Sequence, residues 1–167
     1  TSRQTSVTDP KGNVKTNTYN ADDTLAGITY AVAAGTAPTP NVSFTYDPAY
    51  NRVATMTDGT GTTTYTYHPI TDPPALGAGK LESVDGPLAD DTIEYGYDEL
   101  GRVTTRQIGS AANTQTQQFD TLGRLTALTN PLGSFTYTYE GTTGRPASLT
   151  YPNGQQTTWS YDDNLGD

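Results

Sequence analysis

The chain has 167 residues and carries 18 acidic against 9 basic side chains, a formal net charge of −9. Leu, Ile, Val and Phe are scarce in the chain, and this scarcity together with the high net charge would suggest disorder. However, the chain also has 12 Tyr and 33 Thr, which favour strands. The composition therefore excludes a helix bundle and predicts an all-β protein with a partly aromatic core. The absence of Cys excludes disulfides, Cys-ligated zinc and thiol catalysis. The acidic balance disfavours nucleic acid and anionic membrane surfaces as partners.

The sequence leads us to expect neither a signal peptide nor a transmembrane helix in this chain. The first five residues have no apolar run of the kind found in signal peptides, and no stretch of 18 apolar residues predicts a membrane span. The chain begins without Met and stops inside a repeating pattern. We therefore expect it to be an excerpt of a longer polypeptide.

An internal repeat with a base period near 21 residues runs along the chain. Each unit is anchored on an aromatic residue, which is usually followed by Asp and, after a short turn, by Gly and Arg. Two Pro-rich insertions, predicted to be loops at residues 31–40 and 69–78, account for the longer spacings. In chain order the seven anchors are Tyr19, Tyr46, Tyr67, Tyr97, Phe119, Tyr139 and Tyr161.

The residues around each anchor have a period of two. Aromatic side chains recur two residues before the anchor, as in Tyr65/Tyr67 and Tyr137/Tyr139, and Thr or Ser usually stands between them. This alternation predicts a half-buried strand with an aromatic inner face and a hydroxyl outer face. A second strand such as residues 124–129 follows the turn, so each repeat is a β-hairpin and seven repeats predict about 14 strands.

The motif residues of the repeat have structural roles in this interpretation. The Asp accepts hydrogen bonds from backbone N–H groups two or three residues further on, and the Gly permits a positive φ. The Arg pairs with the Asp or stacks on a neighbouring aromatic ring. The assigned residues are Tyr46, Asp47, Arg52, Tyr97, Asp98, Gly101, Arg102, Phe119, Asp120, Gly123, Arg124, Tyr139, Gly144, Arg145, Tyr161 and Asp162.

The pattern Tyr-Asp-x-x-Gly-Arg at this period resembles the YD repeat of the RHS family. That family includes bacterial Rhs proteins, the C components of insecticidal Tc toxins, wall-associated proteins and the teneurins of animals. The resemblance covers residues 1–167 as a single repeat region. It implies a long, curved, antiparallel sheet of tandem hairpins that is a segment of a hollow β-spiral shell. The family's autoprotease-like core, effector domain and delivery domain have no counterpart in this sequence.

The resemblance implies a structural function. We expect a non-catalytic wall segment that encapsulates or presents a toxin, effector or adhesion domain, in a bacterial protein that is secreted, on the cell surface, or delivered as part of a larger toxin. Its expected partners are the neighbouring repeats and an encapsulated effector domain. No catalytic, metal or cofactor residue is assigned.

Two alternatives stay open. A cell-surface module could bind neutral glycans through exposed aromatic side chains, or the segment could self-associate through its sheet edges. The exposure of four aromatic side chains distinguishes core from sugar binding: Tyr65, Tyr95, Tyr137 and Trp159. If they are buried, they belong to the core. If they form an open stripe on the surface, sugar binding is favoured. We favour core.

Four other features have weak functional interpretations. The lone His68 has no partners at catalytic or metal-binding spacing. The segment Gly77-Ala78-Gly79-Lys80 lacks the first Gly and the Ser or Thr of a phosphate loop. The Asp pairs 22–23, 90–91 and 162–163 do not match a calcium loop and are interpreted as turn residues. Asn41 begins an N-glycosylation sequon that matters only in a eukaryotic secretory context.

Overall fold

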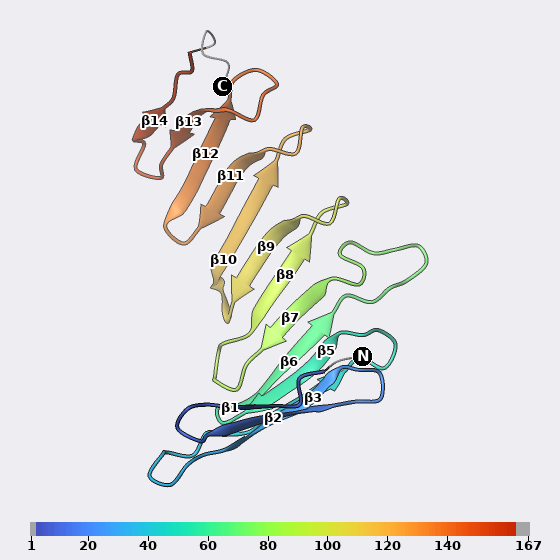
Figure 1. Cartoon of the computed structure of the whole chain (residues 1–167). Coiled ribbons are helices and arrows are strands. Elements are labelled where there is room, and N and C mark those ends of the chain that lie inside the picture. The colour runs from blue at the N-terminus through green and yellow to red at the C-terminus, as the bar shows by residue number, and fades with distance from the viewer. Residues whose placement is uncertain (1–2, 163–167) are drawn as a thin grey trace. The chain divides into compact units, whose positions relative to one another are not determined.

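The structure is a computed structural model that describes residues 3–162, which form strands and turns throughout (Figure 1). Contacts divide the chain into two units. Unit 1 comprises the described residues up to 67 together with 81–92, and unit 2 comprises residues 68–80 together with those from 93 onward. The predicted all-β, antiparallel fold class and the count of 14 strands are confirmed.

Unit 1 contains seven strands that pair antiparallel in sequence order. They are β1 (Ser6–Thr8), β2 (Val14–Tyr19), β3 (Leu25–Ala31), β4 (Val42–Tyr46), β5 (Val53–Asp58), β6 (Gly61–Tyr67) and β7 (Leu81–Asp85). Residues 32–41, between β3 and β4, carry no strand.

Unit 2 contains the other seven strands, again antiparallel and in sequence order. They are β8 (Ile93–Tyr97), β9 (Val103–Ile108), β10 (Ser110–Phe119), β11 (Leu125–Asn130), β12 (Gly133–Tyr139), β13 (Pro146–Thr150) and β14 (Gln156–Thr158). The strandless segment 68–80 also belongs to unit 2 by its contacts.

The predicted alternation of faces is present. In β6 and β12 the aromatic positions are half-buried and the intervening Thr positions are exposed. On the hydroxyl face, neighbouring strands are joined by side-chain pairs such as Thr45 with Thr55, whose Oγ1 atoms are 2.6 Å apart. The period-two pattern therefore identified both faces correctly.

The prediction of a buried aromatic core is wrong for the described residues. No hydrophobic side chain among them is buried, and Trp159 is 42% exposed and lies just after β14. Tyr65, Tyr95 and Tyr137 are half-buried. The reason is that each unit is one sheet layer, and a sheet face is fully buried only when a second layer packs against it.

A register shift occurs at every anchor from Tyr19 to Tyr139. At Phe119, for example, Gln118 pairs with Ala127 whereas Phe119 itself pairs with Leu125. The strand after the turn thus holds one extra residue, which is a β-bulge. Bulges bend a strand and increase its twist, so the repeat places the same local distortion at one end of each hairpin.

Candidate functional site

The repeated turn is the most regular side-chain arrangement in the structure. In the Tyr97 repeat, Asp98 Oδ1 accepts from the backbone N–H groups of Leu100 (3.0 Å) and Arg102 (2.9 Å). Asp98 Oδ2 accepts from Nε of Arg102 at 2.6 Å. The carboxylate therefore closes its own turn and pairs with the Arg at the turn's end. The backbone donors lie two and four residues on, where two or three were expected.

The next repeat reproduces this geometry atom for atom. Asp120 Oδ1 accepts from the N–H groups of Leu122 and Arg124, both at 2.9 Å, and its Oδ2 accepts from Nε of Arg124 at 2.7 Å. In the longer Tyr46 turn, Asp47 accepts from Ala49 N at 2.8 Å and from Nε of Arg52 at 2.9 Å. The predicted pairing of Asp with Arg is thus present in three repeats.

These hydrogen bonds lower the pKa of the carboxylates. The Arg124 backbone N–H is the largest influence on Asp120, and with the Arg124 side chain it holds the pKa of Asp120 below its ordinary value of 3.8. Desolvation raises the pKa of Asp98, but the hydrogen bonds and positive charge of Arg102 outweigh it, so the pKa of Asp98 is also lowered. Both groups are therefore stabilised as carboxylates.

The glycine assignment holds for two repeats and fails in a third. Gly101 and Gly123 have φ angles of 72° and 82°, in the left-handed region that favours glycine. In the Tyr139 repeat, whose turn is one residue longer, Gly141 has the positive φ of 51° and Gly144 does not. Its ion pair is also looser, with 3.7 Å between Arg145 Nη1 and Glu140 Oε2. In this longer turn the left-handed residue comes directly after the acidic residue, whereas in the two shorter turns it comes three residues after it.

Each Arg of the motif also covers the anchor ring of the following repeat. The Arg102 guanidinium carbon lies 4.3 Å from the ring centre of Phe119, and that of Arg124 lies 4.6 Å from Tyr139. Arg52 covers Tyr67 at 4.0 Å and Arg145 covers Tyr161 at 5.2 Å. One guanidinium thus joins its own carboxylate to the next aromatic ring, and we call this three-residue contact the clamp.

The anchor hydroxyls make a second link in the opposite direction. Tyr139 donates from its hydroxyl to the Leu125 carbonyl at 2.8 Å, and Leu125 is the residue paired with Phe119 at the bulge. The same bond is repeated at three other anchors, from Tyr46 to Leu25 (2.9 Å), Tyr67 to Val53 (2.8 Å) and Tyr161 to Pro146 (3.0 Å). We did not anticipate this bond; the preference for Tyr over Phe at the anchors was its only signal in the sequence.

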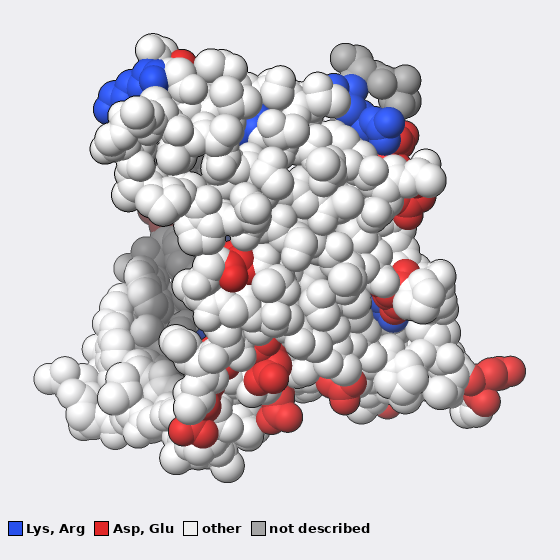
Figure 2. Space-filling model, turned by 90° about the horizontal axis from the view of Figure 1, so that it is seen from below, with Lys and Arg blue, Asp and Glu red and all other residues white. Residues whose placement is uncertain are grey.

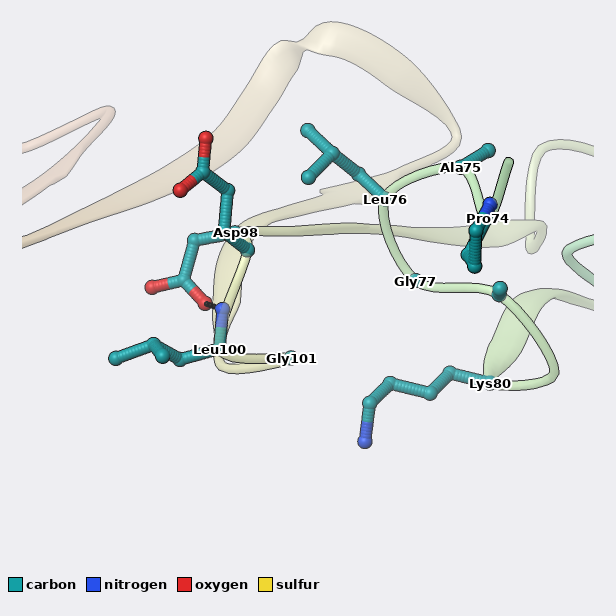
Figure 3. Close-up of a pocket in the computed structure, with 10 residues that line it drawn as sticks. Pro74, Ala75, Leu76, Gly77, Lys80, Asp98, Leu100 and Gly101 are labelled. Atoms are coloured by element: carbon teal, nitrogen blue, oxygen red, sulfur yellow. Dashed lines mark hydrogen bonds between the residues drawn. The ribbon is translucent and has the colours of Figure 1, made fainter. Parts of the chain in front are cut away.

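A pocket of about 380 Å³ lies between the 68–80 segment and the turn after β8 (Figure 3). Pro74, Ala75 and Leu76 form one side and Leu100 and Gly101 the other, and the Lys80 side chain extends between the two segments. Its remaining lining residues are Gly77, Ala78, Asp98 and Glu99.

The ionisable groups of this pocket already have structural partners or point to solvent. Asp98 is committed to its turn, and Glu99 is exposed. The pocket therefore lacks a nucleophile held by a base, and no group of three or more His, Asp or Glu in residues 3–162 could hold a metal ion.

The other candidate residues have structural surroundings. The His68 ring lies edge-on to Tyr97, with its Nε2 3.3 Å from the Tyr95 carbonyl oxygen. Asp91 accepts from the backbone of Gly86 and Leu88, which fits its interpretation as a turn residue. The Asn41 side chain accepts from the Tyr30 N–H. The Asp pair 162–163 falls partly outside the described residues.

The charged side chains of the chain are mostly acidic, 18 Asp and Glu against 9 Lys and Arg. Figure 2 shows a mostly uncharged face on which acidic side chains occur singly or in small groups, in keeping with the net charge of −9. In the described part of the chain no helix is long and apolar enough to cross a membrane.

Comparison with known proteins places these features in a family. The family model described as Teneurin YD-shell matches residues 77–166, more than half of the chain. No curated protein matches.

Solved Tc toxin structures share the fold. A TcdB2-TccC3-Cdc42 crystal structure is 19% identical with a TM-score of 0.67. A mutant Tc holotoxin pore from Photorhabdus luminescens is also 19% identical, with a TM-score of 0.70. A crystal structure of TcdB2-TccC3 without its hypervariable C-terminal region is 19% identical to this chain, with a TM-score of 0.69. Each match covers 92% of this chain but only 9% of the solved chain, so this chain spans about a tenth of the length of those proteins.

The resemblance to YD repeats is thereby confirmed. The family match begins at Gly77 and so includes the complete Tyr97, Phe119 and Tyr139 repeats, in which Asp or Glu, Arg and the next ring recur together. The chain belongs to the Teneurin YD-shell family.

Proposed function

We propose that this chain is a non-catalytic wall segment of a larger RHS-type protein, and that the wall encloses or presents another domain. The observation that carries the proposal is the clamp. Because the Arg of one repeat binds its own turn and the ring of the next, successive repeats that carry the motif are fastened to each other by the same contacts. Repetition of one fastening along a chain suits a scaffold, whereas a catalytic site is normally built once.

The enclosed or presented domain is proposed to be a toxin, an effector or an adhesion domain, and the whole protein to be bacterial and secreted, on the cell surface, or delivered as a toxin. The fold shared with Tc toxin structures supports this proposal. The acidic and largely uncharged surface also suits contact with polypeptide better than contact with nucleic acid.

Protease protection of the full-length polypeptide tests the proposal. Proteinase K followed by mass spectrometry should show a domain outside the repeats that resists cleavage in the parent. A double variant, Asp98→Ala with Asp120→Ala, removes two adjacent clamps and should expose that domain, whereas Glu99→Ala changes an exposed residue of the same turn and should not. Cleavage of every other domain in the folded parent would contradict encapsulation.

Binding of neutral glycans is the second candidate, and the exposed Trp159 is the observation that favours it. The anchor rings are poor stacking platforms because an Arg already covers one face of five of them. A glycan array with the parent and Trp159→Ala separates the two functions. A saccharide that binds the parent and not the variant, at equal stability, would identify a binding module.

Self-association through sheet edges is the third proposal. Among residues 3–162, β1 pairs only with β2 and β14 only with β13. An unpaired strand edge is a template for another strand. Sedimentation velocity at several concentrations should show growth from monomer to oligomer. A monomer at all concentrations would contradict this proposal without affecting the wall assignment.

A further inference from the structure

The 68–80 segment occupies the place of an ordinary clamp turn. The His68 N–H donates to the Lys80 carbonyl at 2.9 Å, as the Asp98 N–H donates to the Arg102 carbonyl at 3.0 Å. The N–H of Gly79 donates to the His68 carbonyl at 3.0 Å and its φ is 74°, and Gly101 makes the equivalent bond at 2.9 Å with a φ of 72°. The insertion therefore starts and ends within the hydrogen-bonded frame of a YD turn.

The side chains that make the clamp are missing from this frame. His68 stands where the turns that form a clamp have Asp or Glu, and Lys80 stands where those turns have Arg. Lys80 makes no salt bridge with the residues described, and its Nζ lies 5.7 Å from the Tyr97 ring centre. The carboxylate is absent and the cation is further from the ring than any clamp Arg. The Asp–Arg pair that completes the clamp elsewhere is therefore not present at Tyr97.

The inserted residues pack against the ring instead. Gly77 is buried, and a Cβ built on it would lie 2.6 Å from Cδ2 of Tyr97 and 2.9 Å from Cδ2 of His68. The His68 ring meets the Tyr97 ring edge-on, with centroids 5.7 Å apart. Partial burial, more than the nearby Tyr95, raises the pKa of Tyr97 above its ordinary value of 10.0.

The segment is itself held in shape by its backbone. The Lys80 N–H donates to the Gly77 carbonyl at 2.8 Å, and the Ala78 N–H donates to the Ala75 carbonyl at 3.1 Å. The Lys80 stem also packs on the turn after β8, where a Cβ on Gly101 would lie 2.5 Å from its Cε. Residues 75–80 thus form a compact cover that reaches from the ring of Tyr97 to the turn that follows it.

We propose that residues 68–80 are a strap that replaces the Asp–Arg clamp at the Tyr97 anchor and holds this ring by packing. The insertion is then a structural part of unit 2, in contrast to a surface loop that can be shortened freely. The contacts of the strap lie within unit 2 and do not depend on what the wall encloses.

The first test is a matched pair of glycine substitutions in the 167-residue chain. Gly77→Ala adds a Cβ at a positive φ of 72° against the Tyr97 ring, whereas Gly154→Ala adds one at a φ of 82° with nothing within 4 Å. Both substitutions place Ala at a positive φ and so strain the backbone, but only Gly77→Ala also disrupts packing. We expect the melting temperature of Gly154→Ala to fall by about 3 °C and that of Gly77→Ala by about 8 °C or more.

Hydrogen exchange locates the damage. Gly77→Ala should lower the amide protection of Tyr97 and Arg102 about tenfold more than Gly154→Ala does. Equal losses of melting temperature and protection in the two variants would overturn the proposal, because packing on Tyr97 would then contribute nothing.

The second test stays informative even where Gly77→Ala fails to fold. Residues 69–79 are replaced by Thr-Leu-Gly, the residues between Asp120 and Arg124, once with His68 and Lys80 kept and once with His68→Asp and Lys80→Arg. The first protein has neither strap nor clamp, and its melting temperature should fall by about 5 °C or more. The second regains the clamp and should return to within about 2 °C of the parent.

Two outcomes of this exchange would overturn the proposal. A short-turn protein with His68 and Lys80 that melts like the parent would show that the strap does not support Tyr97. A clamp-restored protein no more stable than that one would show that strap and clamp are not interchangeable.

Discussion

Replacing Phe119 with Tyr should strengthen the joint between the Tyr97 and Phe119 repeats. Phe119 is the single anchor without a hydroxyl. At the next anchor, the Tyr139 hydroxyl donates to the carbonyl of Leu125, the residue that pairs with Phe119 at the bulge. The equivalent acceptor for residue 119 is the Val103 carbonyl, because Val103 pairs with Tyr97 at the same bulge position. The Phe119→Tyr hydroxyl should therefore reach an acceptor that the fold already positions.

The expected gain follows from the value of one hydrogen bond. A typical intramolecular bond contributes about 0.5–1.5 kcal/mol net. The ring stays under the Arg102 guanidinium, which lies 4.3 Å from its centre, so the clamp should be kept. The reverse change, Tyr139→Phe, removes an observed bond of 2.8 Å and should cost about 1 kcal/mol.

Urea denaturation of the parent and both variants measures these changes. The m value should stay constant while the midpoint rises for Phe119→Tyr and falls for Tyr139→Phe. Tyr139→Phe serves as the control, since it reports the value of the bond where it is known to form. A loss at Tyr139 without any gain at Phe119 would refute the equivalence of the two joints.

The remaining predictions concern the turns and the two faces. Asp98→Ala and Asp120→Ala should lower the urea midpoint to a similar extent, and each should lower it more than Glu99→Ala does. Hydrogen exchange should increase only around the altered turn. Very unequal losses in the two Asp variants would argue against equivalent turns. Because the folded pKa values of both Asp lie below 3.8, their stabilisation is complete above about pH 5 and is lost as the pH falls below 3.8. The Asp98→Asn, Asp120→Asn double variant should therefore lose less stability than the parent between pH 6 and pH 3, and parallel declines would disprove the linkage. Tyr137→Ala should cost about 2 kcal/mol, less than for a fully buried ring, and Thr138→Ala under about 1 kcal/mol; equal losses would contradict the assignment of faces.

The sequence alone determined the features that depend on neighbouring residues. Alternation of Tyr and Thr before an anchor such as Tyr139 follows from the two-residue period of a strand, so the hairpins and their two faces could be predicted. The Asp98–Arg102 turn is equally local, because its bonds join residues two to four positions apart. The motif therefore predicted that a carboxylate, a glycine and a guanidinium group act in the same turn.

The tertiary structure decided what the motif residues do between repeats. The hydroxyl of Tyr139 and the carbonyl of Leu125 are 14 residues apart, and the pairing of β11 with β12 brings them together. Whether Arg102 would stack on a ring was open from the sequence, and which ring it covers depends on strand register. The burial of Gly77 also depends on how the 68–80 segment folds back on Tyr97. These contacts join distant positions, so their geometry is set by the assembled sheet, whereas the residues of a turn carry their own geometry.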